Sequence, residues 1–445
     1  MAPTPTPASL RARPEDGDAV TLRARLRAGA LTAQDALRAC EARIDAVEPW
    51  IHAWVDRDPQ PARARAAALD AAPGGVRAHP GLLAGLPIAL KDLIDTRDWP
   101  TACGSPLRAG RRPARDARIV ERLLDQGAVP AGKTVTTEFG YFQPGPTANP
   151  WNPAHTPGGS SSGSAAAVAA GMVTLALGTQ TAGSLIRPAA YCGVWALKPT
   201  FERYPLDGVQ GLSPSMDTLG WMARSADDLE LLRCALDRTP WAPLPPVNTT
   251  QRPTLRWSLT HEWPLMSPEG AATFHAGLQR LREAGLSLQE WVLPDAMKGL
   301  FDAQRTIMAR EAAQTLAVEL RDHRDQLGTA LQQLLDSGRS VSDADDAAAR
   351  ALADTGRRTL DALLADCDAL LVPGAPGEAP AGLTATGDPA FSRVWNLLGR
   401  PCVQIPGLLG PHGLPVGLQL VGRCGQERAL LSAAKAIGHC LTLTA

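Results

Sequence analysis

The sequence predicts an α/β fold that forms one large domain. Between residues 82 and 237, short apolar runs of strand length alternate with stretches of helical periodicity, which is the pattern of a sheet covered by helices. Strand-like runs return at 368–373, 402–406 and 415–422, after a helix-rich block. Because strands at both ends bracket that block, we expect one domain with an insertion rather than two independent domains.

The individual elements follow from local patterns along the chain. Residues 1–18 are rich in proline and charge and predict a flexible N-terminal tail, and residues 19–445 form the domain, with a variable helix-rich insertion at about 241–366. The first half should contain helices at about 18–29 and 32–46, a strand PIAL before Lys91, a helix at 117–127, a strand AVPAGKTV, a helix at 163–171 and a strand at 172–178. After a loop at 238–253, the second half should contain strands TLRWSL and SLQEWVL around a helix at about 268–284, helices over 297–366 with a break near Ser337–Asp345, the three late strands and a helix at about 425–440.

The composition predicts a soluble globular protein. Of the 445 residues 44% are hydrophobic, enough for a large core, and 44 basic against 45 acidic side chains leave a net charge of −1. Without a strong electrostatic field, binding to nucleic acid or to an acidic membrane surface is not expected. The eight cysteines lie far apart without metal-ligand spacing, and no apolar run has signal-peptide or membrane-helix character. We therefore expect reduced thiols, no metal site and a cytoplasmic protein.

Two turns rich in glycine and serine carry the strongest chemical signal. The first is GGSSSGS at 158–164, and the second is GTQTAGSLIRP at 178–188. A Gly/Ser run by itself is typical of a flexible linker. Here, however, the apolar run AAAVAAGMVTLALG joins the two turns and predicts buried structure. Turns joined in this way can bring backbone N–H groups and hydroxyls to one point, as an acyl-transfer site requires.

A serine nucleophile needs a base, and the sequence offers few candidates. The eight histidines are scattered, and only His155 lies near the serine turns. Lys91 ends the apolar run GLPIALK, where burial without a close anion would lower its pKa and leave a neutral amine able to accept a proton. The alternative is an ordinary strand-end lysine that pairs with Asp92 or Asp95.

These segments resemble a known family. The stretch 158–200, GGSSSGSAAAVAAGMVTLALGTQTAGSLIRPAAYCGVWALKPT, resembles the signature of the amidase signature family, and GLPIALKDLID resembles its lysine segment. Further segments match in family order: DARIVERLLDQGAVPAGKTVTTEFG, NPWNPAHTPGGSS, LSPSMDTLGWMARSADDLELL and GRPCVQIPGLLGPHGLPVGLQLVG. The resemblance covers about 80–240 and 367–440, and the block 241–360 is uninformative. It implies the amidase signature fold, in which a mixed central sheet is covered by helices on both faces.

The resemblance also implies a Ser–cis-Ser–Lys triad. Ser184 matches the nucleophile, Ser160 the serine that follows a cis peptide bond, and Lys91 the base. In the implied mechanism neutral Lys91 draws a proton through Ser160 from Ser184, which attacks the carbonyl while backbone N–H groups hold the oxyanion. The expected oxyanion residues are Thr181, Ala182, Gly183 and Ser184, and the expected supporting residues are Ser161, Gly159, Gln180 and Arg187.

Several residues depart from the commonest form of the signature. Ser162 and Ala182 stand where glycine is usual, and Gln180 stands where aspartate is usual. Ala182 would strain the oxyanion turn only if that position needs a positive φ. Arg187 lies directly before Pro188, which leaves the role of this arginine open.

Two other motif matches suggest different enzymes. Residues 127–134, GAVPAGKT, fit the phosphate-loop pattern GxxxxGK[ST], but a helical pattern precedes them and the loop positions themselves have the pattern of a strand. Residues 159–163, GSSSG, fit the GxSxG elbow of an α/β-hydrolase with Ser161 as nucleophile, but a proline-rich turn stands where that elbow needs a buried strand. The context disfavours both.

We therefore expect a hydrolase, without metal or organic cofactor, that cleaves the carbon–nitrogen acyl bond of an amide, anilide or carbamate. The expected partner is a neutral, apolar or aromatic small molecule, and a homodimer is left open. Two enzyme alternatives remain: the glutamine-hydrolysing amidase subunit of a tRNA-dependent amidotransferase, and an amidase-fold esterase or carbamate hydrolase of the urethanase type. A protein of this fold that binds a ligand without turnover is disfavoured by the intact triad residues.

The substrate pocket is the least constrained expectation. Its candidate walls are the aromatic cluster and two residues of the helical block: Phe139, Tyr141, Phe142, Ile307 and Met308. Apolar residues at such spacing also fit a plain core, which is the alternative. Arg187 and Arg203 are candidates for a counter-charge that would suit glutamine instead.

Overall fold

The computed structural model describes residues 6–13, 16–247 and 252–443 of the chain. The strands are β1 (Trp54–Asp56), β2 (Pro87–Lys91), β3 (Val129–Thr134), β4 (Leu175–Gln180), β5 (Trp195–Lys198), β6 (Thr218–Ala223), β7 (Leu255–Trp257), β8 (Leu288–Glu290), β9 (Ala369–Pro373), β10 (Cys402–Leu409) and β11 (Pro415–Val421). Within the described ranges they form an 11-stranded sheet in the order β1-β3-β2-β4-β6-β5-β10-β11-β9-β7-β8. Pairs such as β2–β4 are parallel and pairs such as β4–β6 are antiparallel, so the sheet is mixed.

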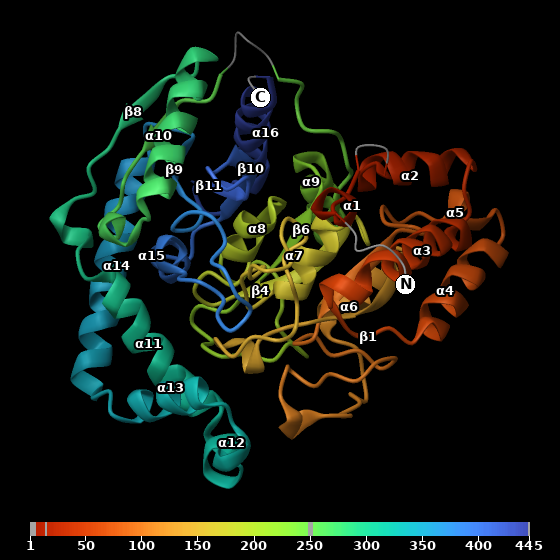
Figure 1. Ribbon diagram of the computed structural model, residues 1–445, viewed down its shortest axis with the longest axis horizontal. Coiled ribbons are helices and arrows are strands. Elements are labelled where there is room, and N and C mark those ends of the chain that lie inside the picture. The colour runs from red at the N-terminus through yellow and green to blue at the C-terminus, as the bar shows by residue number, and fades with distance from the viewer. Residues whose placement is uncertain (1–5, 14–15, 248–251, 444–445) are drawn as a thin grey trace.

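Helices cover both faces of this sheet (Figure 1). They are α1 (Pro7–Leu10), α2 (Ala19–Ala28), α3 (Ala33–Ile51), α4 (Pro59–Ala71), α5 (Gly75–Ala78), α6 (Arg118–Asp125), α7 (Ser162–Ala169), α8 (Ile186–Cys192), α9 (Ala226–Asp237), α10 (Pro268–Glu283), α11 (Leu300–Thr315), α12 (Ala317–Asp322), α13 (Thr329–Arg339), α14 (Asp343–Leu364), α15 (Ala390–Leu397) and α16 (Glu427–Leu443). In Figure 1 the N-terminal helices α2–α5 lie at one side of the molecule and helices α11–α14 at the opposite side.

Side-chain alternation along the strands explains the two cores. In β2, Ala89 packs into one buried cluster with α7 and α11, whereas Ile88 and Leu90 pack into the other with α9 and α16. In β4, Ala176 and its neighbours divide in the same way. Small residues on the α7 side allow this helix of alanine and serine to lie close to the sheet. The predicted α/β fold with a mixed sheet and helices on both faces is therefore confirmed.

The helical block differs in detail from its prediction. The expected break near Ser337–Asp345 is present, because α14 starts with Ser342 as N-cap, whose side chain accepts from the Asp345 amide. The chain also breaks after α11 and after α12, so the block consists of four helices rather than two. The boundaries of the insertion, 241–366, stay a prediction.

The expected tail packs against the domain where it is described. Leu10 of α1 is 1% exposed, and the Ala12 amide donates to the Ala169 carbonyl at 2.7 Å. The Arg43 guanidinium donates to the Arg11 carbonyl at 2.7 Å and to the Ser9 carbonyl at 3.2 Å. A leucine and an arginine thus hold residues 6–13 against the domain, whereas residues 1–5 and 14–15 lie outside the described part. The flexible tail over 1–18 stays a prediction.

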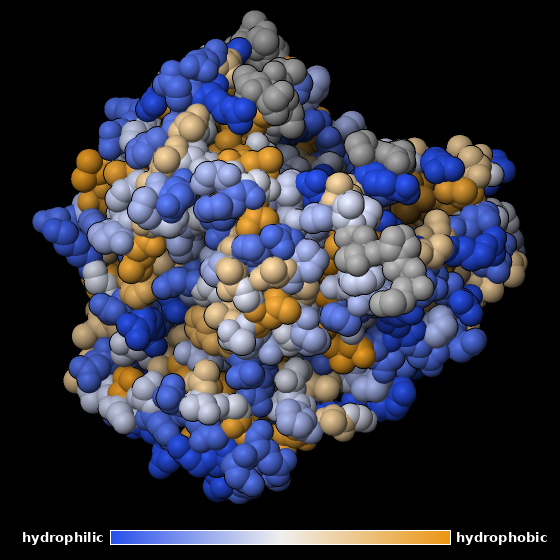
Figure 2. Space-filling view, in the orientation of Figure 1, coloured by the Kyte–Doolittle hydropathy of each residue, from blue (hydrophilic) through white to orange (hydrophobic). Residues whose placement is uncertain are grey.

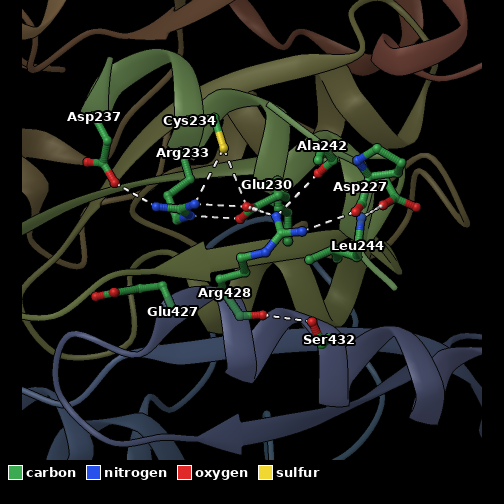
Figure 3. Close-up of polar contacts among 12 residues, drawn as sticks. Asp227, Glu230, Arg233, Cys234, Asp237, Ala242, Leu244, Glu427, Arg428 and Ser432 are labelled. Atoms are coloured by element: carbon green, nitrogen blue, oxygen red, sulfur yellow. Dashed lines mark hydrogen bonds and ion pairs between the residues drawn. The ribbon is translucent and has the colours of Figure 1, made fainter. Parts of the chain in front are cut away.

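Ion pairs join the C-terminal helix α16 to α9 (Figure 3). Arg428 of α16 pairs with buried Glu230 of α9 and donates to the Pro243 carbonyl at 3.1 Å. Arg233 binds the same carboxylate at 2.7 Å and Asp237 at 2.7 Å. The network ties α16 to α9 on the face of the sheet away from α7.

The described helices are all too short or too polar to span a bilayer. On the face shown in Figure 2, hydrophobic residues are scattered among hydrophilic ones.

Candidate active site

The site lies at one edge of the central sheet. Strands β2 and β4 are parallel neighbours, so their carboxyl ends meet at the same edge. Lys91 ends β2, and Gln180 ends β4. The two Gly/Ser turns lead into α7 and α8, whose first residues are Ser162 and Ile186. This topology brings together segments that are about 70 to 90 residues apart in the sequence, as the hydrogen bonds of Lys91 show.

Lys91 is fully buried and reaches the first serine. Its Nζ lies 2.7 Å from Ser160 Oγ and 2.8 Å from Thr179 Oγ1. No carboxylate among the described residues forms an ion pair with it. Burial therefore lowers the pKa of Lys91 well below its usual value, and the more distant charge of Asp217 opposes that shift. A lysine in this state can accept a proton.

The alternative pairing of Lys91 with a neighbouring aspartate is not found. Asp92 lies 3.4 Å from Lys133, and Asp95 binds Arg111 at 2.7 Å. Lys133 also donates to the Ile94 carbonyl at 2.7 Å. Lys133, the lysine of the phosphate-loop match, is thus buried and bonded to groups of the core, so it is not available to bind a phosphate.

The peptide bond between Gly159 and Ser160 is cis, as the resemblance implied. Arg187 holds the carbonyl of this bond: its Nη2 and Nε donate to Gly159 O at 2.6 and 3.2 Å, and its Nη1 donates to the Gly387 carbonyl. Arg187 is 3% exposed, and burial lowers its pKa to about 10. These donors are all engaged by backbone carbonyls, so Arg187 joins the serine turn to the segment around Gly387.

Ser161 and Gln180 tie the two turns together. The Ser161 amide donates to the Ser184 carbonyl at 3.1 Å, and its hydroxyl bridges the backbone of Thr179. Gln180 Oε1 accepts from the Leu185 and Ile186 amides at 3.0 Å each. The side-chain oxygen of Gln180 therefore accepts hydrogen bonds from two backbone N–H groups at the start of α8. Ser161 is fully buried and its hydroxyl is bonded to the backbone, so it is not placed like the exposed nucleophile of an elbow.

The turn at 181–184 presents its backbone to a pocket. The N–H groups of these residues have no acceptor within the described part of the chain, and all four residues line the pocket together with Ser160. Ala182 does not adopt a positive φ, so alanine in place of glycine causes no strain. Gly183 is needed for close approach, because a Cβ there would lie 2.7 Å from Pro389 Cβ.

Side chains that the sequence did not indicate fix this turn from behind. Asp217 accepts from Thr181 Oγ1 at 2.5 Å and from the Leu212 amide at 2.8 Å. The Thr181 carbonyl accepts from Asn396 at 2.7 Å and from Gln304 at 3.1 Å. Asp217 stands in the family-like segment SPSMDTLG, which could have indicated it, whereas Gln304 lies in the uninformative block.

The predicted pocket walls divide into two groups. Tyr141, Phe142 and Met308 line the pocket, which is narrow, with a volume of about 20 Å³. Phe139 and Ile307 do not: they are 0% and 1% exposed and belong to the core. Along α11 neighbouring residues point about 100° apart, so Met308 faces the pocket while Ile307 faces inward. The wall prediction is wrong for Phe139 and Ile307.

Other candidates lie outside the pocket. His155 does not line it, and Arg203 is bound to Asp237 at 2.6 Å and so does not supply a counter-charge. In the part of the chain that the structure describes, no cluster of three or more acidic, histidine or cysteine side chains could hold a metal ion. None of the eight cysteines, all of which lie in the described part of the chain, forms a disulfide bond.

A buried lysine bonded to one serine, a second serine on the same pocket, and backbone amides without an acceptor among the described residues form an arrangement that is suited to acyl transfer. The chain belongs to the amidase family: the family model, described as Amidase, matches residues 35–431. It is thus an amidase-family enzyme that acts on carbon–nitrogen bonds.

Similar proteins span the family. A glutamyl-tRNA(Gln) amidotransferase subunit from Synechococcus sp. (strain WH7803) is 33% identical, with 88% of this chain and 91% of that protein covered. An amidase of known crystal structure is 29% identical, covers 95% of this chain and 99% of its own, and has a TM-score of 0.86. The peptide amidase PAM in complex with chymostatin is 30% identical over 95% and 97% of the two chains, with a TM-score of 0.79.

Proposed function

We propose that the chain hydrolyses a carbon–nitrogen acyl bond through a covalent intermediate on Ser184. The observation that carries the proposal is the contact of 2.7 Å between fully buried Lys91 and Ser160 Oγ, on the pocket that Ser184 also lines. A neutral lysine is a competent base only when burial has lowered its pKa, which is the direction found for Lys91.

The proton follows a relay in this mechanism. Ser184 Oγ attacks the acyl carbon while its proton passes to Ser160 Oγ, and the Ser160 proton passes to Lys91 Nζ. The carbonyl oxygen gains negative charge, which the unpaired N–H groups of the 181–184 turn stabilise. The relay then returns the proton to the leaving nitrogen, and the C–N bond breaks to release the amine. A water molecule attacks the acyl-enzyme by the same route and regenerates Ser184.

For the substrate we propose a small-molecule amide, anilide or carbamate whose acyl side is uncharged next to the reacting carbonyl. The walls of the inner pocket support this class, because Tyr141, Phe142, Met308 and Leu212 offer rings and apolar side chains at that position. Arg187, the one charged wall residue of the inner pocket among those described, is already satisfied by backbone carbonyls.

The glutamine-hydrolysing subunit is the second candidate, and the curated relatives favour it. Relatives of 33% to 35% identity over about nine tenths of the chain carry the name of a glutamyl-tRNA(Gln) amidotransferase subunit. Such a protein acts within a complex, so this candidate predicts a partner protein. The first candidate predicts activity of the chain alone, as a monomer or homodimer. Eight cysteines that form no disulfide bond in the described residues support a reducing, cytoplasmic location for either candidate.

One experiment separates the candidates. The purified chain is offered a neutral p-nitroanilide, an aryl carbamate and glutamine, each with wild type and Ser184→Ala, and kcat/KM is measured. Turnover of the anilide or carbamate that disappears in Ser184→Ala supports the first candidate. Glutamine as the preferred substrate, together with co-purification of a second subunit, supports the second. Turnover that survives in Ser184→Ala contradicts the mechanism itself.

A further inference from the structure

A second chamber adjoins the inner pocket on its outer side. It is open, has a volume of about 500 Å³, and is lined by residues of α11, α13 and α15. Tyr141, Phe142 and Met308 line both chambers, so the two share a wall. A substrate that places its carbonyl at Ser184 can therefore extend past these side chains into the outer chamber.

The outer chamber contains an arginine without an acidic partner. Arg393 is 6% exposed, and its Nη1 donates to Gln304 Oε1 at 2.6 Å. Its Nε is buried without a partner, and no carboxylate in the described ranges forms an ion pair with the guanidinium. Burying a cation without a counter-ion is costly, and such arginines normally meet a carboxylate. Even so, burial lowers the pKa of Arg393 only to about 10, so the side chain stays charged at neutral pH.

Packing orients Arg393 toward the chamber. Arg393 lines the chamber, and its guanidinium lies over the Phe301 ring, 5.4 Å from the centroid. Two aspartates are weak competitors because both are exposed: Asp388, whose charge acts on Arg393, and Asp302, which lines the chamber wall. Arg305 adds positive charge at the rim, where it is exposed and lies 3.6 Å from Asp302.

Arg393 is also linked to the oxyanion turn. Gln304 accepts from Arg393 and donates to the Thr181 carbonyl at 3.1 Å, so one side chain joins the two sites. Ser392, next to Arg393, lies against Gly183, where a Cβ would be 3.3 Å from Ser392 Cβ. A ligand bound to Arg393 is thus connected to the turn that faces the reacting carbonyl through one residue, Gln304.

We propose that the substrate carries a carboxylate at its far end and that Arg393 binds this carboxylate in the outer chamber. The inference rests on the proposed function and adds to it: the acyl group is uncharged at the reacting end and anionic at the distal end. Nε and Nη2 form no hydrogen bond within the described residues, and this pair of nitrogens matches the two oxygens of a carboxylate, whereas a neutral substrate leaves the buried cation unpaired.

The test uses pairs of substrates that differ only in distal charge. These are the mono-p-nitroanilides of succinic, glutaric, adipic and suberic acid, each compared with its methyl ester. For at least one chain length we expect the acid to have the higher kcat/KM. In Arg393→Met that preference should fall by about 100-fold, as for truncation of one member of a buried charge pair. Arg393→Lys should retain part of the preference, and Arg305→Gln at the exposed rim should lose about threefold or less.

The methyl esters distinguish substrate binding from a structural role. If Arg393 only holds Gln304 and the oxyanion turn, Arg393→Met slows acids and esters equally, and the proposal is overturned. Equal kcat/KM for acid and ester at every length overturns it as well. Titration calorimetry of the acids with Ser184→Ala, and with Ser184→Ala/Arg393→Met, tests binding without turnover. Tight binding to Ser184→Ala that is lost in Ser184→Ala/Arg393→Met supports the proposal even if the proposed hydrolysis fails. Equal binding to the two variants contradicts it.

Discussion

Lys91 Nζ lies 2.7 Å from Ser160 Oγ, at a point in the core where no carboxylate within the described residues reaches the amine. The lysine is buried because β2 places it at the end of an apolar run beneath the serine turn. Its pKa is consequently lowered, and the proposed mechanism depends on the neutral form.

The first prediction concerns the pH dependence of the rate. Because protonated Lys91 cannot act as the base, kcat/KM should be low in acid, rise through an apparent pKa well below 10.5, and level off in alkali. Lys91→Met should lose most of the rate together with this dependence. A pH–rate profile for a neutral anilide checks it, with His155→Gln as the matched control. An unchanged profile in Lys91→Met, or its loss in His155→Gln, would assign the base to His155.

Asp217 provides a second pH test with a defined sign. Its charge raises the pKa of Lys91, against the larger effect of burial. Asparagine at position 217 can keep the bonds to Thr181 and to the Leu212 amide, since Oδ1 accepts from the backbone and Nδ2 donates to the hydroxyl. Asp217→Asn should therefore move the rising limb of the rate profile to lower pH with a similar plateau. A shift to higher pH contradicts the assignment.

The same residue affects stability. Burial raises the pKa of Asp217 from 3.8 to about 6, so the protonated form favours the folded state. This contribution is fully present below pH 3.8 and is lost as pH rises through about 6, at a cost of about 3 kcal/mol. Chemical denaturation of wild type and Asp217→Asn between pH 4 and 7 measures it. We expect the difference in unfolding free energy between the two proteins to change with pH in that window, and a constant difference would refute the shift.

The serines should differ in their effects. Ser184→Ala should abolish turnover and labelling by fluorophosphonate probes, because it removes the proposed nucleophile. Ser160→Ala should slow turnover by about three orders of magnitude or more while leaving the oxyanion donors in place. Thermal melting of both variants controls for misfolding. Retained labelling of Ser184→Ala would make Ser161 the next candidate, and near-normal activity of Ser160→Ala would end the relay.

The sequence predicted those parts of the site that lie in continuous segments. Lys91 was recognisable because a charged residue ends an apolar run, and the serine turns because buried structure joins them. The role of Arg187 was not predictable, since its acceptors Gly159 and Gly387 are brought together only by the fold. Gln304 lies in a block without recognisable pattern.

Local clustering also failed to separate wall from core. Phe139, Tyr141 and Phe142 are adjacent in sequence, yet Phe139 is buried with φ near 46° while the other two line the pocket. The direction in which a side chain points at a bend depends on the backbone conformation, which the residue type alone does not specify. The sequence also did not indicate that α1 packs against the domain. The contact depends on Arg43, whose acceptors, the carbonyls of Ser9 and Arg11, are brought to it only by the fold.

That division gives a prediction for paired variants. Phe139→Ala removes a core ring and should lower the free energy of unfolding by about 3–5 kcal/mol. Phe142→Ala should cost much less stability but change kcat/KM for aryl substrates, because its ring lines the pocket. Denaturant titration and kinetics on both variants check the contrast. Equal loss of stability would place Phe142 in the core instead.

The last prediction concerns two adjacent residues of the oxyanion turn: substitution of Gly183 should slow the reaction strongly, and substitution of Ala182 should change the rate little. In Gly183→Ala the new Cβ would lie 2.7 Å from Pro389 Cβ, so the turn must move and its N–H groups lose their aim. Losing one oxyanion donor typically costs about 100- to 1000-fold in rate, and we expect a decrease of that order. Ala182→Gly should change kcat/KM by about threefold or less, because Ala182 already avoids a positive φ and gains nothing from glycine. Melting temperatures for both variants distinguish an effect on folding from an effect on catalysis.

Two outcomes would contradict these expectations. If Ala182→Gly is many-fold faster than wild type, alanine does strain the turn. If Gly183→Ala is fully active, the 181–184 amides do not stabilise the oxyanion, and other donors on the pocket wall must replace them.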